Sequence, residues 1–245
     1  MTFVVFGGTR TGSSLLVDTL RTHPQVQCDV NRGEILHGNH WRRGAKRLLR
    51  YPMHRFPEPY LFWAAHRRTK QVYGFKLLTH QIAAPGRLIT NLYRSGWLVI
   101  HIQRRRLCDL ALSQQVAQLT NHYGPYMPTK QPDPTLIAVT PDSFIQQMQH
   151  CTDTMRGELQ TLAGIPRLRV IYEADLCNQV ETNRTCSAIF TTLGIEQRPV
   201  TTSRTRSWNR QYSELIPTFD ELQALMQMEK SLELQAVWDR FFMED

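Results

Sequence analysis

The beginning of the chain constrains the fold most, because an apolar run there ends in a glycine-rich turn. Residues 3–6, FVVF, run straight into GGTRTGSSLL, and a helix-like amphipathic stretch follows over residues 13–21. A buried strand, a tight turn and a helix start gather several backbone N–H groups at one point, which favours an anion. This order predicts an anion-binding loop. The alternative is an ordinary strand-to-helix turn that contains serines by chance.

The cation of this loop stands in an unusual place. Gly7 and Gly12 have the G-x-x-x-x-G spacing of an ATP-binding phosphate loop, but Ser13 replaces the lysine that should follow, and the cation is Arg10. A guanidinium suits bidentate contact with phosphate or sulfate, and Ser13 and Ser14 add hydroxyl donors. A magnesium-dependent nucleotide triphosphatase also needs an Asp at the end of a second strand. The candidate strand WLVIHIQRRR ends in arginines instead, so we expect an anion other than Mg-ATP.

Short apolar runs alternate with helix-like stretches along the chain. This alternation predicts an α/β fold with a central parallel sheet flanked by helices, in a P-loop-like architecture. The length of 245 residues suits a single domain, 1–245. Two segments break the pattern and are expected to be irregular, 37–70 and 124–141. The expected strands are 3–6, 72–78, 97–102 and 168–172, and the expected helices are 13–21, 86–93, 107–122, 143–162, 182–193 and 219–242.

Composition narrows the class of partner and the compartment. A net charge of +8 and a pI near 9.5 favour an anionic partner, such as a nucleotide or a phosphorylated metabolite. The five cysteines include no C-x-x-C pair, which indicates reduced thiols. No apolar stretch approaches the length of a membrane span. We therefore expect a cytoplasmic protein. The apolar side of the last helix, 219–242, is expected to be core or a homodimer face.

A second cluster of functional residues follows the strand at 97–102. Arg105, Asp109 and Ser113 are spaced four and four, so they share one face of a helix. In an open parallel sheet the carboxyl end of a strand lies at the ligand-binding edge. Basic charge over residues 104–106 is unfavourable at a helix N-terminus, which favours a bound anion there. The alternative is a solvated basic cap.

These two segments together resemble the site for 3′-phosphoadenosine 5′-phosphosulfate (PAPS) in sulfotransferases, most of all bacterial enzymes that modify carbohydrates. GGTRTGSSLLVDTLRTHP is similar to the loop that holds the 5′-phosphosulfate, and the pair Arg105 and Ser113 to the clamp on the 3′-phosphate. Further similar stretches are NRGEIL, GFKLL, VIYEADL and RTRSWNRQYSELIPTFDEL, in the expected order. The resemblance implies PAPS as donor, without a metal. The donor-binding residues that it implies in the loop are Arg10, Thr11, Gly12, Ser13 and Ser14.

The resemblance also implies candidates for the general base. Glu34, in RGEIL, matches the position of a catalytic Glu in several carbohydrate and tyrosine sulfotransferases. Its alternative is a surface residue paired with Arg32. His80 is the rival base, although it stands four residues after Lys76 where cytosolic sulfotransferases place a His two residues after a Lys. Lys76 is expected either to contact the sulfonate or to pair with Glu34 or another acid.

Two arginines late in the sequence are further candidates for donor binding. Arg204 and Arg206 are candidates for a further contact to the 3′-phosphate, or else simple surface charge. The expected acceptor is a hydroxyl of a carbohydrate or glycolipid, with no nucleic acid as partner. Two other functions remain open, a small-molecule kinase with a P-loop-like site and a non-catalytic nucleotide- or nucleic-acid-binding protein.

Overall fold

The computed structural model describes residues 1–29, 57–120, 137–201, 213 and 216–229. The chain forms two compact units. The first contains Met1–Arg106 and Asp153–Arg204, and the second contains Leu107–Thr152 and Thr205–Asp245.

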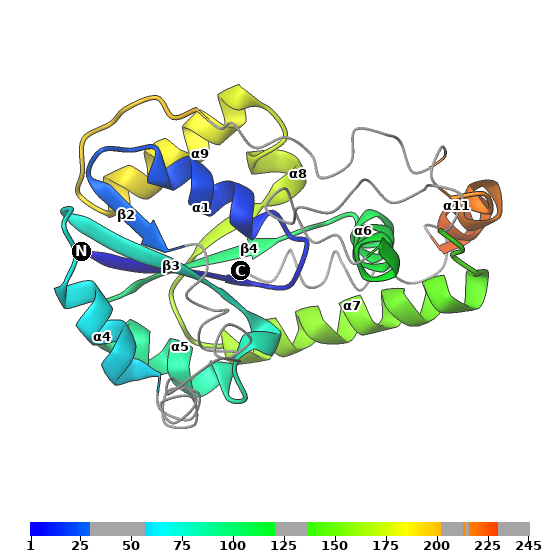
Figure 1. Cartoon of the computed structure of the whole chain (residues 1–245), viewed down its shortest axis with the longest axis horizontal. Coiled ribbons are helices and arrows are strands. Elements are labelled where there is room, and N and C mark those ends of the chain that lie inside the picture. Colours follow the sequence, from blue (N-terminus) through cyan, green and yellow to red (C-terminus); the bar gives the residue numbers. More distant parts are fainter. Residues whose placement is uncertain (30–56, 121–136, 202–212, 214–215, 230–245) are drawn as a thin grey trace. The chain divides into compact units, whose positions relative to one another are not determined.

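A five-stranded parallel sheet forms the centre of the first unit (Figure 1). Its strand order is β2-β3-β1-β4-β5, and β1 pairs with β3 on one side and with β4 on the other. The predicted α/β fold with a parallel central sheet is therefore confirmed. The strands are β1 (Thr2–Gly7), β2 (Val26–Asp29), β3 (Val72–Leu78), β4 (Leu98–Gln103) and β5 (Leu168–Ile171).

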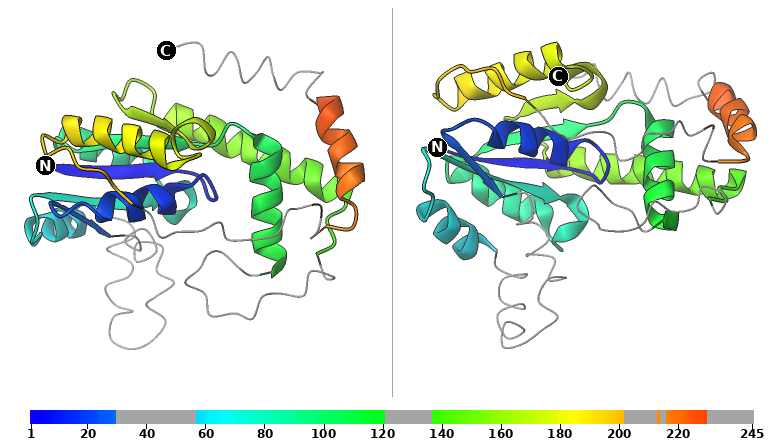
Figure 2. Two further views of the ribbon diagram at one scale, coloured as in Figure 1. Left: turned by 90° about the horizontal axis from the view of Figure 1, so that it is seen from above. Right: turned by 45° about the horizontal axis from the view of Figure 1, so that its top comes forward.

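Helices cover both faces of this sheet, because its central strand is apolar on both sides. In β1, Phe3 and Val5 pack into one cluster with α1 (Ser13–Arg21) and α9 (Gln179–Thr192). Val4 and Phe6 point the other way and pack with α4 (Glu58–His66) and α5 (Pro85–Arg94). Figures 1 and 2 show α1 and α9 on the same side of the sheet. Burial on both faces explains the unbroken apolar run FVVF in the sequence.

The connections after neighbouring strands leave the sheet on opposite faces. The chain leaves β1 through α1, which packs in the first cluster, whereas it leaves β3 through η2 (Thr79–Gln81) and α5, which packs in the second. In open parallel sheets, ligands bind outside the carboxyl ends of strands at such a point. The ends of β1 and β3 are therefore where a site is expected.

The expected irregular segment 37–70 needs a correction. Residues 30–56 lie outside the described part of the chain, but α4 occupies much of the remainder. Its Leu61 is fully buried in the second cluster, which explains why this helix forms, while Trp63 is half exposed. The segment had no clear period because α4 is apolar on most of its surface, as EPYLFWAAH shows. The other segment, 124–141, is described only from residue 137, and a helix begins at Pro141.

The second unit is described through three helical segments. They are α6 (Leu107–Thr120), residues 141–152 of α7 (Pro141–Thr161), and α11 (Phe219–Glu229). Gln147 donates its Nε2–H to Gln114 Oε1 at 2.7 Å, which joins α7 to α6 within this unit. Leu222 of α11 is fully buried, in agreement with a core role. Across the described residues, none of the helices combines the length and apolar character that crossing a membrane requires.

Candidate active site at the ends of strands β1 and β3

The loop between β1 and α1 depends on two residues in the left-handed backbone region. Arg10 has φ 62° and Gly12 has φ 94°. A Cβ placed on Gly12 would lie 2.4 Å from Cδ2 of Tyr172, far inside normal carbon–carbon contact. Gly12 is therefore required twice, for its backbone conformation and for the space that Tyr172 occupies.

Side chains hold the carbonyl groups of this loop. The Thr11 hydroxyl donates to the carbonyl oxygen of Gly8 at 2.9 Å, and Arg104 Nη1 donates to the carbonyl oxygen of Arg10 at 3.4 Å. Gly12 is the N-cap residue of α1, and among the described residues no side chain caps this helix start. The first N–H groups of a helix have no intrahelical partner. The loop and helix start together form the arrangement that binds anions.

Strand β3 brings a lysine to the same helix start. Lys76 lies beside Val5 in the sheet, and its Nζ donates to Ser14 Oγ at 2.9 Å. Only 6% of Lys76 is exposed. A positive charge at a helix N-terminus opposes the helix dipole, so a nearby ammonium favours an anion bound at this point. Lys76 thus contacts the start of α1, and its expected contact with the sulfonate, or with Glu34 or another acid, stays a prediction.

Arginines follow β4, and one carboxylate organises them. Glu173 accepts hydrogen bonds from the backbone N–H groups of Arg105 at 2.8 Å and Arg106 at 3.1 Å. Its Oε1 is also 3.4 Å from Nε of Arg104, whose guanidinium lies 5.1 Å from the centre of the Tyr172 ring. Glu173 thus supplies negative charge beside these arginines. An anion bound beside residues 104–106 stays a prediction, because the contacts of Arg105 and Arg106 with Glu173 involve their backbone N–H groups.

The other predicted residues are distributed as follows. His80 is exposed in η2, beyond the end of β3. Ser113 is buried on α6 in the second unit, so its pairing with Arg105 stays a prediction. Glu34, Arg204 and Arg206 lie outside the described residues. No cluster of three or more His, Cys, Asp or Glu side chains suited to a metal occurs within the described ranges.

The sequence did not predict roles for Arg104, Tyr172 and Glu173. Arg104 appeared only as part of a basic run, although it is the member that contacts the loop backbone. Tyr172 and Glu173 belong to VIYEADL, which was noted for its resemblance to sulfotransferases and not for any chemistry. A tyrosine followed by an acid directly after a strand is the signal that was present.

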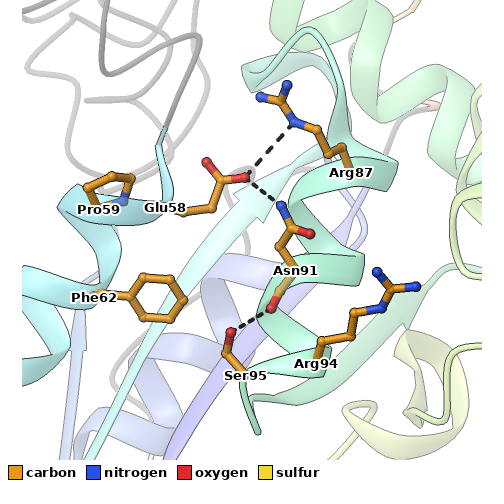
Figure 3. Close-up of a pocket in the computed structure, with 7 residues that line it drawn as sticks. All are labelled: Glu58, Pro59, Phe62, Arg87, Asn91, Arg94 and Ser95. Atoms are coloured by element: carbon orange, nitrogen blue, oxygen red, sulfur yellow. Dashed lines mark hydrogen bonds and ion pairs between the residues drawn. The ribbon is translucent and has the colours of Figure 1, made fainter.

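A groove lies elsewhere, between α4 and α5 (Figure 3). Glu58 accepts a hydrogen bond from Asn91 Nδ2 at 2.9 Å and is 4.0 Å from Arg87 Nε. Its lining includes no residue of the loop, Lys76 or residues 104–106. The candidate site is therefore assigned from the converging donors and charges, and not from this groove. The groove is lined by Glu58, Pro59, Phe62, Arg87, Asn91, Arg94 and Ser95.

Comparison with known proteins supports the fold. The chain is similar to the crystal structure of a sulfotransferase from Alicyclobacillus acidocaldarius, with a TM-score of 0.54 and 11% sequence identity. The similarity covers 99% of this chain and 96% of that one. No protein-family model matches the chain, and no curated protein matches its sequence. At this identity the likeness concerns the fold alone.

Proposed function

We propose that this chain is a PAPS-dependent sulfotransferase, which moves a sulfonate group from PAPS to a hydroxyl of a carbohydrate or glycolipid. The observation that carries the proposal is the contact between Lys76 Nζ and Ser14 Oγ at 2.9 Å. It joins GFKLL and GGTRTGSSLL, two stretches that resemble sulfotransferases, at one edge of the sheet. The shared fold with a sulfotransferase supports the same assignment.

The chemistry asks the loop to stabilise negative charge. An acceptor oxygen attacks sulfur, a new S–O bond forms, and the S–O bond to the 5′-phosphate breaks. The leaving group is adenosine 3′,5′-bisphosphate. The loop N–H groups, Arg10 and Lys76 are the donors for the charge that develops on the phosphate and sulfonate oxygens, an electrostatic role that needs no covalent step by the protein.

The acceptor proton must pass to a base. Glu34 is the proposed base, because its segment resembles the catalytic-Glu position of glycan-modifying sulfotransferases. His80 is the rival, since it follows β3 closely and is exposed. A positioned general base is worth about 10²–10⁴ in rate, so the two candidates can be separated by turnover.

The 3′-phosphate of PAPS is proposed to bind residues that follow β4, and not the loop after β1. Arg105 and Ser113 are the proposed pair, with Arg204 and Arg206 as further cations. The backbone of Arg105 is already fixed by Glu173, and this contact involves the N–H group, not the guanidinium. The Arg105 side chain therefore starts from a defined position two residues after β4.

Thermal stabilisation by adenosine 3′,5′-bisphosphate tests the proposal. A ligand that binds only the folded chain raises the melting temperature, and we expect this without added metal. Lys76→Met should reduce the rise. Lys70→Met is the matched control. Lys70 precedes β3, and its Nζ donates to the carbonyl oxygen of Val26, which is not a residue of the loop.

Three outcomes would overturn the assignment. Greater stabilisation by ATP with Mg²⁺ than by the bisphosphate would indicate a kinase. Steeply salt-dependent binding of DNA or RNA, with no competition by nucleotide, would indicate a nucleic-acid-binding protein. Equal loss in the Lys76 and Lys70 variants would remove Lys76 from the site.

A further inference from the structure

A buried polar cluster lies beside Gly8 of the loop. Glu158 of α7 is 1% exposed, and its Oε1 accepts a hydrogen bond from the Thr79 hydroxyl at 2.9 Å. Its Oε2 is 3.1 Å from Nε2 of His101, a fully buried residue of β4. Thr79 is the first residue after β3. One carboxylate thus joins the end of β3, the middle of β4 and α7.

The His101 ring meets Glu158 through Nε2. Its other nitrogen, Nδ1, is buried and has no hydrogen-bond partner among the described residues. An unpaired buried ring nitrogen and a buried carboxyl group both cost stability. A cluster of this kind is therefore weak as a stabilising device.

The cluster does contact the start of the anion loop. Thr79 Oγ1 is also 3.3 Å from the carbonyl oxygen of Gly7, the last residue of β1. The single proton of the Thr79 hydroxyl is therefore shared between Glu158 Oε1 and the carbonyl oxygen of Gly7, with the nearer acceptor at Glu158. A Cβ on Gly8 would lie 3.0 Å from Glu158 Oε1, so the carboxylate occupies the space beside Gly8. The carbonyl oxygen of Gly8 in turn accepts the hydrogen bond that the Thr11 hydroxyl donates within the loop.

We propose that Glu158 is a positioning residue for the loop. It orients the Thr79 hydroxyl and packs against Gly8, and His101 holds the carboxylate in place from β4. Lys76 stands three residues before Thr79, so this arrangement fixes the distance between Lys76 and the loop N–H groups. Preorganised donors need no rearrangement when charge develops, so a fixed spacing is what sulfonate transfer requires. This last step rests on the proposed function, whereas the effect on the loop does not.

A pair of substitutions at Thr79 tests the positioning. Thr79→Val removes the hydroxyl and keeps the shape, and Thr79→Ser keeps the hydroxyl. The matched control is Thr182→Val, because Thr182 is also buried and donates to a backbone carbonyl, that of Asn178, at 2.7 Å. The first readout is amide hydrogen exchange of residues 8–14 in the ligand-free chain. The second is the affinity for adenosine 3′,5′-bisphosphate.

We expect Thr79→Val to speed exchange of the loop amides by about tenfold and to weaken bisphosphate binding by a similar factor, the equivalent of one net hydrogen bond. Thr79→Ser should restore both, and Thr182→Val should change neither. Glu158→Gln is expected to resemble Thr79→Val, since one oxygen acceptor is replaced by an NH₂ donor. Loop exchange in Thr79→Val no faster than in Thr182→Val would overturn the positioning role.

The two proposals fail in different ways. If the wild-type chain does not bind the bisphosphate, the donor assignment is wrong, and the exchange comparison still decides whether Glu158 and Thr79 position the loop. If the wild-type chain binds the bisphosphate but the loop amides of Thr79→Val exchange no faster than those of Thr182→Val, the donor assignment stands and the positioning role is wrong.

Discussion

Replacing Gly12 by alanine measures how tightly the loop is enclosed. Gly12 has φ 94°, and its added Cβ would meet the Tyr172 ring at 2.4 Å. The left-handed conformation costs a non-glycine residue about 1–2 kcal/mol, and overpacking of a filled site costs about 1–3 kcal/mol more. Gly12→Ala should therefore lower the free energy of unfolding by about 2–5 kcal/mol.

Gly96→Ala separates the two contributions. Gly96 has φ 81° and nothing lies within 4 Å of its added Cβ, so this variant carries the backbone cost alone. The expected difference between the two variants is about 1–3 kcal/mol, or about 2–12 °C in melting temperature for a chain of this size. Differential scanning calorimetry of both variants measures it.

A double variant identifies Tyr172 as the cause. In a Tyr172→Ala background, the clash is gone and Gly12→Ala should cost no more than Gly96→Ala. Equal losses for Gly12→Ala and Gly96→Ala in the wild-type background would refute the enclosure of the loop by Tyr172. So would an unchanged cost of Gly12→Ala after the ring is removed.

Three further predictions concern the donor, the base and the thiols. Arg105→Ala should weaken PAPS binding by about 1.5–3 kcal/mol but spare adenosine 5′-phosphosulfate, and equal losses in calorimetry would place Arg105 away from the 3′-phosphate. Glu34→Gln should lower turnover by about 10²–10⁴ with bisphosphate binding retained, and a larger fall in His80→Asn would transfer the base to His80. Burial raises the pKa of the Cys186 thiol to about 12. At pH 8 iodoacetamide should therefore label exposed Cys177 first, and mass spectrometry that finds Cys186 equally labelled would contradict its burial.

The fold was largely predictable because its strongest signals are local. Residues 72–78 form β3 with the predicted bounds, since this strand is buried on both faces and is apolar apart from Lys76. Strand β2 was missed. It has only four residues, VQCD, two of them polar, and it pairs with β3 alone among the described strands. Such a short edge strand is specified by its neighbour more than by its own sequence.

The candidate site was predictable only in part, for a physical reason. Arg10 was a candidate because a cation inside a glycine-rich turn is conspicuous in sequence, and Lys76 because GFKLL resembles a stretch of sulfotransferases. The cluster of Glu158, Thr79 and His101 was not, since its members are 57 residues or more from Glu158 along the chain. A buried polar contact between distant segments leaves no periodic signal. His101 was read simply as part of an apolar strand.

On the proposed function, the left-handed conformation of Arg10 sets folding and donor binding in opposition at one residue. At φ 62° glycine would be more favourable for the folded chain, by a cost that is of order 1–3 kcal/mol for other residues. Selection for thermal resistance alone would therefore drift toward Arg10→Gly and discard the loop cation without any visible defect in expression. A thermostabilised variant of this chain should be tested for anion binding as well as for melting temperature, because substitution of Arg10 by glycine should change the two properties in opposite directions.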